Sequence, residues 1–119
     1  MASDTYNEPL ELLSGDTRDM HRAIVSLMEE LEAIDWYQQR AEACADAQLK
    51  AVLVHNKNEE IEHASMIMEW IRRRSDHFNE MLRKYLFTEQ PITAIEKAAE
   101  TDSPSAATEA LGIGSMKGR

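Results

Sequence analysis

The sequence predicts an all-α fold: an antiparallel helical hairpin and a short C-terminal helix, completed by dimerisation to a four-helix bundle. Two observations predict the helices. Only 4 Gly and 3 Pro occur among 119 residues, and no segment alternates apolar with polar side chains as a strand does. The third observation, two apolar stripes that each extend over about 30 residues, predicts the pairing of two copies.

Composition restricts the partners of the chain. The 13 Lys and Arg against 22 Asp and Glu give a net charge of −9, which argues against a nucleic-acid binder. The longest apolar run, residues 51–54, is too short for a transmembrane helix. The acidic N-terminus lacks the apolar core of a secretory signal, and the single Cys44 suits a reducing compartment. We therefore expect one cytoplasmic domain with no membrane partner.

The first helix is expected from about Asn7 to Glu42, after a disordered segment 1–6. Asn7 is a suitable N-cap, with Glu8 and Glu11 in the first turn. The patch Ser14-Gly15-Asp16 is the weak point, where the helix can kink or restart. The helical spacing comes from the apolar residues Leu10, Leu13, Met20, Ile24, Leu27, Leu31 and Ile34.

A second long helix is expected from about Ala47 to Arg74, capped by Asp46. A third follows over about Ser75 to Leu86, and residues 92–99 form a short helical stretch. The stripe of the second helix consists of Leu49, Leu53, Asn56, Glu60, His63, Ile67 and Trp70.

The C-terminal region changes character twice. The helical domain is expected over residues 7–96, and the small polar residues of 97–110 are typical of a flexible linker. Leu111, Ile113 and Met116 then place apolar side chains among glycines in the tail 111–119. Such a tail suits docking into a hydrophobic groove, although most chain ends of this kind merely fray.

Helix length by itself favours an oligomer. Two helices near 30 residues each would extend roughly 40–50 Å. A single antiparallel pair cannot bury both stripes, and a second copy would do so in a four-helix bundle.

Three ionisable residues interrupt the apolar stripes. Glu30 lies three residues after Leu27 and four before Ile34, so it shares their face. Glu60 and His63 form a Glu-x-x-His element with both side chains on one face. A carboxylate inside a bundle is costly unless it is paired or binds a metal, and these groups suit iron, manganese or zinc.

The number of ligands also favours a dimer. A di-iron carboxylate bundle uses a Glu from each of two helices and a Glu-x-x-His from each of the other two. One chain supplies half of this set, and two chains related by a two-fold axis supply all of it. The alternative, a solvated acidic face with an ordinary surface histidine, remains about equally compatible with the residues alone.

Further acids surround Glu30. Glu29 and Glu32 lie beside it, in a region that is either a solvated surface or a patch that collects cations. Trp36 and Tyr37 follow on the same helix, and the Tyr37 hydroxyl can donate a hydrogen bond near a metal or simply face water.

Three segments and the tail together resemble the encapsulated ferritins, the ferritin-like cargo of encapsulin nanocompartments. The segments are MEELEAIDWY at 28–37, HNKNEEIEH at 55–63 and YLFTE at 85–89, followed by LGIGSM at 111–116. The resemblance covers roughly residues 8–95 and the tail.

The resemblance implies a ferritin-like helical domain and a ferroxidase. It implies iron ligands at Glu30, Glu60 and His63 from both chains of a dimer, with two iron ions per dimer. It also implies a metal-uptake site at Glu29 and Glu32. Trp36 and Tyr37 would lie close to the iron.

The same resemblance implies how the protein assembles and where it works. Five dimers would form a ring, typically a decamer. The tail, through Leu111, Ile113 and Met116, would bind the encapsulin shell protein. The product would be mineralised and stored inside that shell, in the cytoplasm.

Two other functions stay open at this point. A non-enzymatic assembly or adaptor protein would use the helical stripes alone, with the acids merely solvating it. A di-iron peroxidase would share the metal site, although the chain has no cysteine set of the rubredoxin kind.

Overall fold

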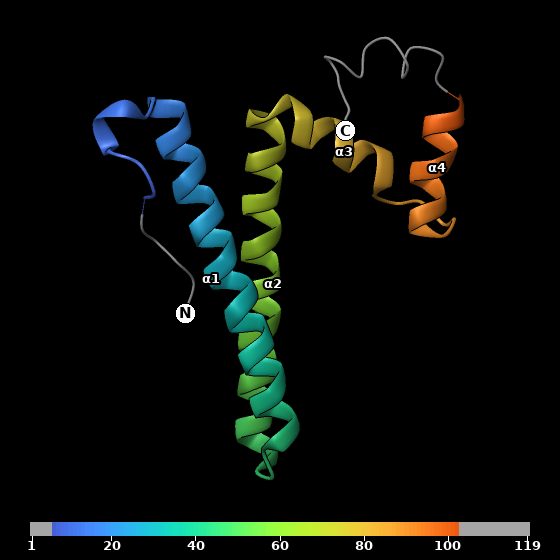
Figure 1. Ribbon diagram of the computed structural model, residues 1–119. Coiled ribbons are helices and arrows are strands. Elements are labelled where there is room, and N and C mark those ends of the chain that lie inside the picture. Colours follow the sequence, from blue (N-terminus) through green and yellow to red (C-terminus); the bar gives the residue numbers. More distant parts are fainter. Residues whose placement is uncertain (1–5, 103–119) are drawn as a thin grey trace. The chain divides into compact units, whose positions relative to one another are not determined.

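The structure, a computed structural model, describes residues 6–102, with side chains up to residue 98. Four α-helices occur there: α1 (Gly15–Ala43), α2 (Ala47–Arg74), α3 (Asp76–Tyr85) and α4 (Ile92–Asp102) (Figure 1). A short 3-10 helix, Leu10–Leu12, precedes them. These residues contain no strand, so the predicted all-α class is confirmed. No helix within the described residues is long and apolar enough to cross a bilayer.

The chain divides into two compact units after Phe78. The first contains α1 and α2, which lie side by side as an antiparallel hairpin (Figure 1). At 1.5 Å per residue, these helices of 29 and 28 residues are each about 43 Å long.

The start of α1 differs from the expectation. Ser14 is the N-cap, and its hydroxyl accepts a hydrogen bond from the Thr17 N–H at 3.1 Å. This bond satisfies an N–H group that would otherwise lack a partner, so α1 begins at Gly15 and the expected start at Asn7 was wrong. The Leu10 carbonyl accepts a hydrogen bond from Arg18, which ties the 3-10 helix to α1.

The N-terminal boundary also needs correction. The Tyr6 ring stacks on His21 with 4.0 Å between the ring centroids. Residue 6, expected within a disordered segment, therefore has a defined contact with α1. Residues 1–5 lie outside the described part of the chain.

The second helix has the predicted bounds. The Asp46 carboxylate accepts a hydrogen bond from the Leu49 N–H at 2.7 Å, the capping that its position predicted. Helix α2 ends at its C-cap Ser75, where the backbone becomes extended (φ −123°, ψ 112°) although the Ser75 N–H still donates to the Ile71 carbonyl. The Ser75 hydroxyl accepts from the Phe78 N–H at 3.1 Å, so the same residue also caps α3.

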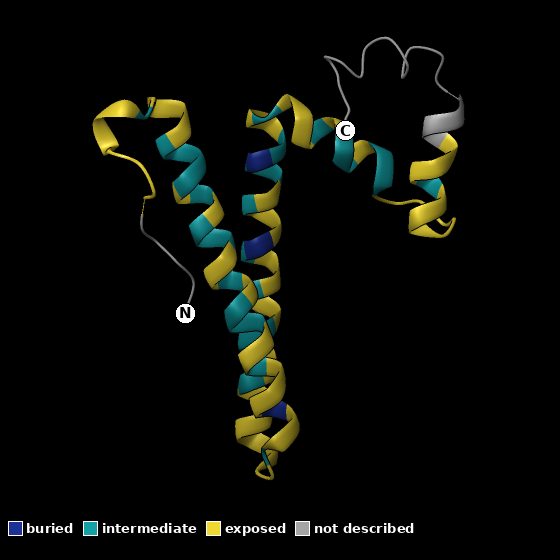
Figure 2. Ribbon diagram, in the orientation of Figure 1, coloured by how far each residue is buried: buried dark blue, intermediate teal, exposed yellow. Residues whose placement is uncertain are grey.

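The hairpin buries little of its apolar surface. Among the described residues only Ala41, Ala64 and Ile71 are buried (Figure 2). Ile24 and Leu31 of the predicted stripe are 39% and 51% exposed, which agrees with the expectation that a single antiparallel pair cannot bury both stripes. Two helices cover only one side of each other, so the predicted stripes are wider than the contact between α1 and α2.

The boundary between the helical domain and the linker lies later in the chain than expected. Helix α4 continues to Asp102, so residues 97–102, expected in the linker, are helical. The rest of that linker lies outside the described residues, as do Leu111, Ile113 and Met116 of the tail.

Candidate metal centre

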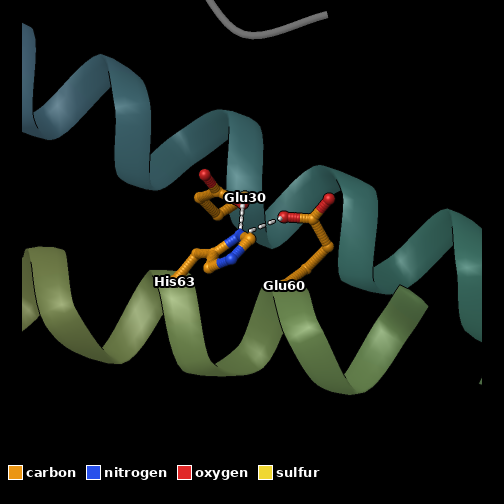
Figure 3. A group of neighbouring side chains, drawn as sticks. All are labelled: Glu30, Glu60 and His63. Atoms are coloured by element: carbon orange, nitrogen blue, oxygen red, sulfur yellow. Dashed lines mark hydrogen bonds and ion pairs between the residues drawn. The ribbon is translucent and has the colours of Figure 1, made fainter. Parts of the chain in front are cut away.

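Three side chains meet between the two long helices. Glu30 comes from α1, and Glu60 and His63 come from successive turns of one face of α2. Each offers one ligand atom, and these atoms all lie within 4.8 Å of one another. Figure 3 shows the side chains pointing toward one another across the hairpin. Within the described residues this is the one group of three or more His, Cys, Asp or Glu placed to hold a metal ion.

The histidine ring is placed against both carboxylates. His63 Nδ1 lies 3.2 Å from Glu60 Oε1 and 3.8 Å from Glu30 Oε1 (Figure 3). The side chains of Glu30 and Glu60 are each 25% exposed, and the side chain of His63 is 44% exposed. The centre is therefore partly desolvated, yet open on one side of the hairpin.

The three groups shift one another's pKa values. The pKa of Glu30 is raised, chiefly by a hydrogen bond to Glu60 and then by burial. The pKa of Glu60 is lowered, chiefly because it receives that hydrogen bond from Glu30. The pKa of His63 is raised, first by its hydrogen bond to Glu60. The two carboxyl groups thus titrate as a hydrogen-bonded pair, in which Glu30 keeps its proton to higher pH than Glu60.

Metal binding at this centre is expected to release protons. A metal ligand must be deprotonated, whereas the raised pKa values of Glu30 and His63 keep protons on both to higher pH than usual. Affinity should therefore rise with pH, and the rise should continue above 6.5, the ordinary pKa of histidine. Calorimetry of anaerobic Fe(II) or Co(II) binding in buffers of different ionisation enthalpy measures the protons released. Affinity that is constant from pH 5.5 to 8 would contradict this assignment.

The donor set fits a first-row divalent ion. Carboxylate oxygen and imidazole nitrogen are ligands that iron, manganese and zinc accept. With metal–ligand bonds of about 2.1 Å, two ligands of one ion lie at most about 4.2 Å apart. The observed spread of 4.8 Å is slightly larger, so small rotamer changes would close the three groups around an ion.

The other predicted site residues lie outside this group of three. Glu29 is exposed and Glu32 is partly buried. Glu29 acts on the centre only through its charge, which helps to raise the pKa of Glu30. Trp36 is 45% exposed and Tyr37 is partly buried, so neither ring is enclosed in the hairpin.

Sequence reasoning missed two features near the centre. The Arg40 guanidinium lies 5.6 Å from the Trp36 ring centroid and 5.7 Å from that of Tyr37, a cation–π arrangement. The i, i+3 and i, i+4 spacings of Arg40 from the two rings were a readable signal for it.

The second missed feature is an open groove of about 540 Å³ between α1 and α2, with Glu30 among its lining residues. Its signal was the small pair Ala23 and Ser26 at helical spacing, opposite large side chains of α2. The groove is lined by Asp19, Arg22, Ala23, Ser26, Glu30, Met66, Ile67 and Trp70.

Comparison with known proteins agrees with this hairpin and its ligand group. The EncFtn-like family model matches residues 5–89, a span that contains both long helices and all three candidate ligands. The chain belongs to the EncFtn-like family.

Individual relatives support the same family assignment. An encapsulated ferritin-like protein of Rhodospirillum rubrum is 53% identical over 98% of this chain and 91% of its own length. A ferritin-like protein of Thermotoga maritima is 45% identical over 93% of this chain and 96% of its own length. The encapsulin nanocompartment cargo protein EncC of Myxococcus xanthus is 28% identical over 86% of this chain and 87% of its own length.

A solved structure shares the EncFtn-like fold. The crystal structure of protein ne0167 from Nitrosomonas europaea is 60% identical to this chain and superposes with a TM-score of 0.71. The match covers 73% of this chain and 96% of that one. The family match and the named relatives confirm the predicted resemblance to encapsulated ferritins.

Proposed function

We propose that this EncFtn-like protein is a ferroxidase that oxidises Fe(II) to Fe(III) with dioxygen at a site shared by two copies. The observation that carries the proposal is the convergence of Glu30, Glu60 and His63 on a hairpin of this family. Iron is both the substrate and the metal held by these residues, two ions for each pair of chains.

The need for a second copy follows from the incomplete ligand set. One chain offers two carboxylates and one imidazole within reach of an ion. A two-fold partner would bring the set to four carboxylates and two imidazoles, as in ferritin-like di-iron bundles. The open side of the centre and the exposed Ile24 and Leu31 leave a surface for that partner. Further association of such dimers into a decameric ring would cover more of this surface.

The ligand chemistry favours oxidation. Each Fe(II) ion would give up one electron, so the two ions of a site supply two electrons that, with two protons, reduce dioxygen to hydrogen peroxide. Anionic oxygen ligands stabilise the more highly charged Fe(III) product. Both carboxylates would hold the metal as anions, so any proton that the raised pKa keeps on Glu30 is released as iron binds. Glu60, which lies against both Glu30 and His63, would hold iron together with them. His63 supplies a neutral nitrogen ligand.

Neighbouring residues have supporting roles in the proposal. Glu29 and Glu32 gather Fe(II) at the surface and pass it to the centre, since acidic groups on α1 attract cations from solution. Trp36 and Tyr37 lie further along α1, beneath the Arg40 guanidinium, and would shield the side of the centre nearest the hairpin turn.

An encapsulin shell is the proposed destination. Two relatives are named for encapsulation, one as an encapsulated ferritin-like protein and the other as an encapsulin nanocompartment cargo protein. The tail 111–119 would bind the shell protein through Leu111, Ile113 and Met116, after a spacer that allows reach. Ferric product would then mineralise inside the shell.

Anaerobic Fe(II) titration followed by air tests the function directly. Ferric absorbance should saturate near one iron per chain, the ratio of an inter-subunit di-iron site. Molar mass, read by light scattering in the same samples, should rise to dimers or larger rings as iron is added. An absence of ferric signal together with an unchanged mass would favour the non-enzymatic adaptor. Faster turnover with peroxide than with dioxygen would favour a peroxidase.

A further inference from the structure

A lysine lies one helical turn from the candidate metal centre. Lys57 precedes Glu60 by three residues on α2, so the two side chains are neighbours on the surface of the helix. Glu60 is also the one acid among the residues three or four positions from Lys57 on this helix. An ammonium group is an ordinary partner for such a carboxylate, and it would occupy the oxygen atoms that a metal ion needs.

The structure pairs Lys57 across the hairpin instead. Its Nζ donates a hydrogen bond to Gln38 Oε1 of α1 at 2.8 Å. Gln38 comes eight residues after Glu30, which is roughly 12 Å along α1 toward the hairpin turn. The bond therefore directs the ammonium toward that turn and away from the level of Glu30.

The amide of Gln38 is itself oriented for this bond. Its Nε2 donates a long hydrogen bond of 3.4 Å to Glu42 Oε2, one turn further along α1. Because the nitrogen of the amide faces Glu42, its oxygen is left for Lys57. The side chains of Glu42, Gln38 and Lys57 thus form a chain of hydrogen bonds that leads from α1 to α2.

The electrostatics of Glu60 agree with this placement of the ammonium. The pKa of Glu60 is lowered chiefly by the hydrogen bond from Glu30, and also by the hydrogen bond and the charge of His63, while burial opposes the shift. Lys57 is not among these influences, although it is only one turn away on the same helix. Its charge therefore acts elsewhere than on this carboxylate.

We propose that Gln38 is a positioning residue, which holds the Lys57 ammonium away from Glu60 and so leaves this carboxylate free for a metal ion. An ammonium paired with Glu60 would have to be displaced before a metal could bind, and its positive charge would repel a divalent cation. The inference deepens the proposed function, because it rests on Glu60 as a metal ligand.

Binding of Co(II) to the full chain, measured by calorimetry at one protein concentration, tests the role of Gln38. Gln38→Leu releases the ammonium and should weaken Co(II) binding by about two- to fivefold, the effect expected of one partly exposed ion pair at Glu60. The difference from the wild type should shrink as ionic strength rises, because salt screens such a pair. Gln39→Leu is the matched control, since Gln39 is the next residue of α1 and is also exposed, and it should bind as the wild type does.

Variants of Lys57 separate positioning from a purely structural bond. Lys57→Met removes the ammonium and should bind Co(II) at least as tightly as the wild type. Gln38→Leu combined with Lys57→Met should regain that affinity, although the bond between the helices is absent from this chain too. Gln38→Glu keeps an acceptor for the ammonium and should not lose affinity.

Oxidation kinetics provide a second measurement. Gln38→Leu should need about two- to fivefold more Fe(II) for its half-maximal rate, yet reach the wild-type maximal rate, because iron displaces the ammonium once it is in excess. A lower maximal rate with an unchanged half-saturating Fe(II) concentration would contradict the inference.

The remaining outcomes also decide. Unchanged Co(II) affinity in Gln38→Leu would overturn the inference. A double variant as weak as Gln38→Leu alone would do the same, because the bond would then serve only to hold the two helices in register. A wild-type chain with no affinity for Co(II) would contradict the proposed metal centre itself and the inference with it, so the two failures are distinguishable.

Discussion

Replacement of Glu60 by alanine is expected to lower the initial rate of Fe(II) oxidation by at least about 100-fold. Loss of a residue that only supports a metal ligand typically costs 10–100-fold in metal affinity or activity. Loss of the ligand itself should therefore reduce the rate by more than this. Glu60 is central because it contacts both Glu30 and His63. The variant should also lose iron-dependent growth in molar mass, because each shared site would lose two carboxylates.

The three candidate ligands should behave alike, and their neighbours should not. Glu30→Ala and His63→Ala are expected to reduce oxidation strongly, as measured by the rise in ferric absorbance after addition of air. Glu62→Ala is the matched control: Glu62 lies between Glu60 and His63 in sequence but is exposed and outside the ligand group. Full activity in all three ligand variants would show that these residues are not metal ligands but part of an ordinary solvated surface.

The proposed uptake residues can be separated from the ligands by their kinetics. Glu29→Gln combined with Glu32→Gln removes charge without altering the group of three. Oxidation should slow at low Fe(II) and recover at saturating Fe(II), because attraction of the substrate is impaired while the centre is intact. An equal loss at all iron concentrations would instead place one of these residues at the centre.

Removal of residues 111–119 is expected to abolish loading into an encapsulin shell while leaving oxidation unchanged. The candidate ligands and the hairpin lie entirely within residues 15–74, so the deletion does not touch them. Co-expression with the shell protein, followed by isolation of shells, measures loading as the ratio of cargo to shell. The free protein from the same cells provides the oxidation rate.

A length-matched variant makes the tail experiment specific. The triple variant Leu111→Ser, Ile113→Ser and Met116→Ser keeps the tail at nine residues but removes these three apolar side chains. This variant should fail to load as completely as the deletion does, because apolar contacts hold a short peptide in a groove. Loading of either variant at the wild-type ratio would show that another part of the chain binds the shell.

Local signals in the sequence located most helix boundaries. Asp46 caps α2 where its position predicted, and three arginines end the helix, so both bounds were readable from side chains that act on their own backbone. The start of α1 was harder, because Asn7 and Ser14 are both good caps. Ser14 is the cap of α1, because its hydroxyl accepts a hydrogen bond from the Thr17 N–H. The residues after Asn7 do not start α1, because Leu10–Leu12 form a 3-10 helix.

The candidate centre was readable because it rests on helical periodicity. The three-residue spacing of Glu60 and His63 places them on one face of α2 whatever that helix packs against. The groove beside Glu30 was not readable, because its walls come from two helices and its floor depends on how far apart they lie. The hydrogen bond from Lys57 to Gln38 was likewise hidden, since it too depends on how the two helices lie against each other.

The sequence by itself determined the helices, the hairpin and the three inward polar residues, because caps and periodicity act within about one turn of the chain. Only the tertiary structure brought Glu30 of α1 to within 4.8 Å of the α2 ligands, since this distance depends on the register of one helix against the other. The sequence also predicted that one hairpin cannot bury both stripes, but only the structure showed that Ile24 and Leu31 are among the residues left exposed, because burial of each residue depends on how the two helices pack.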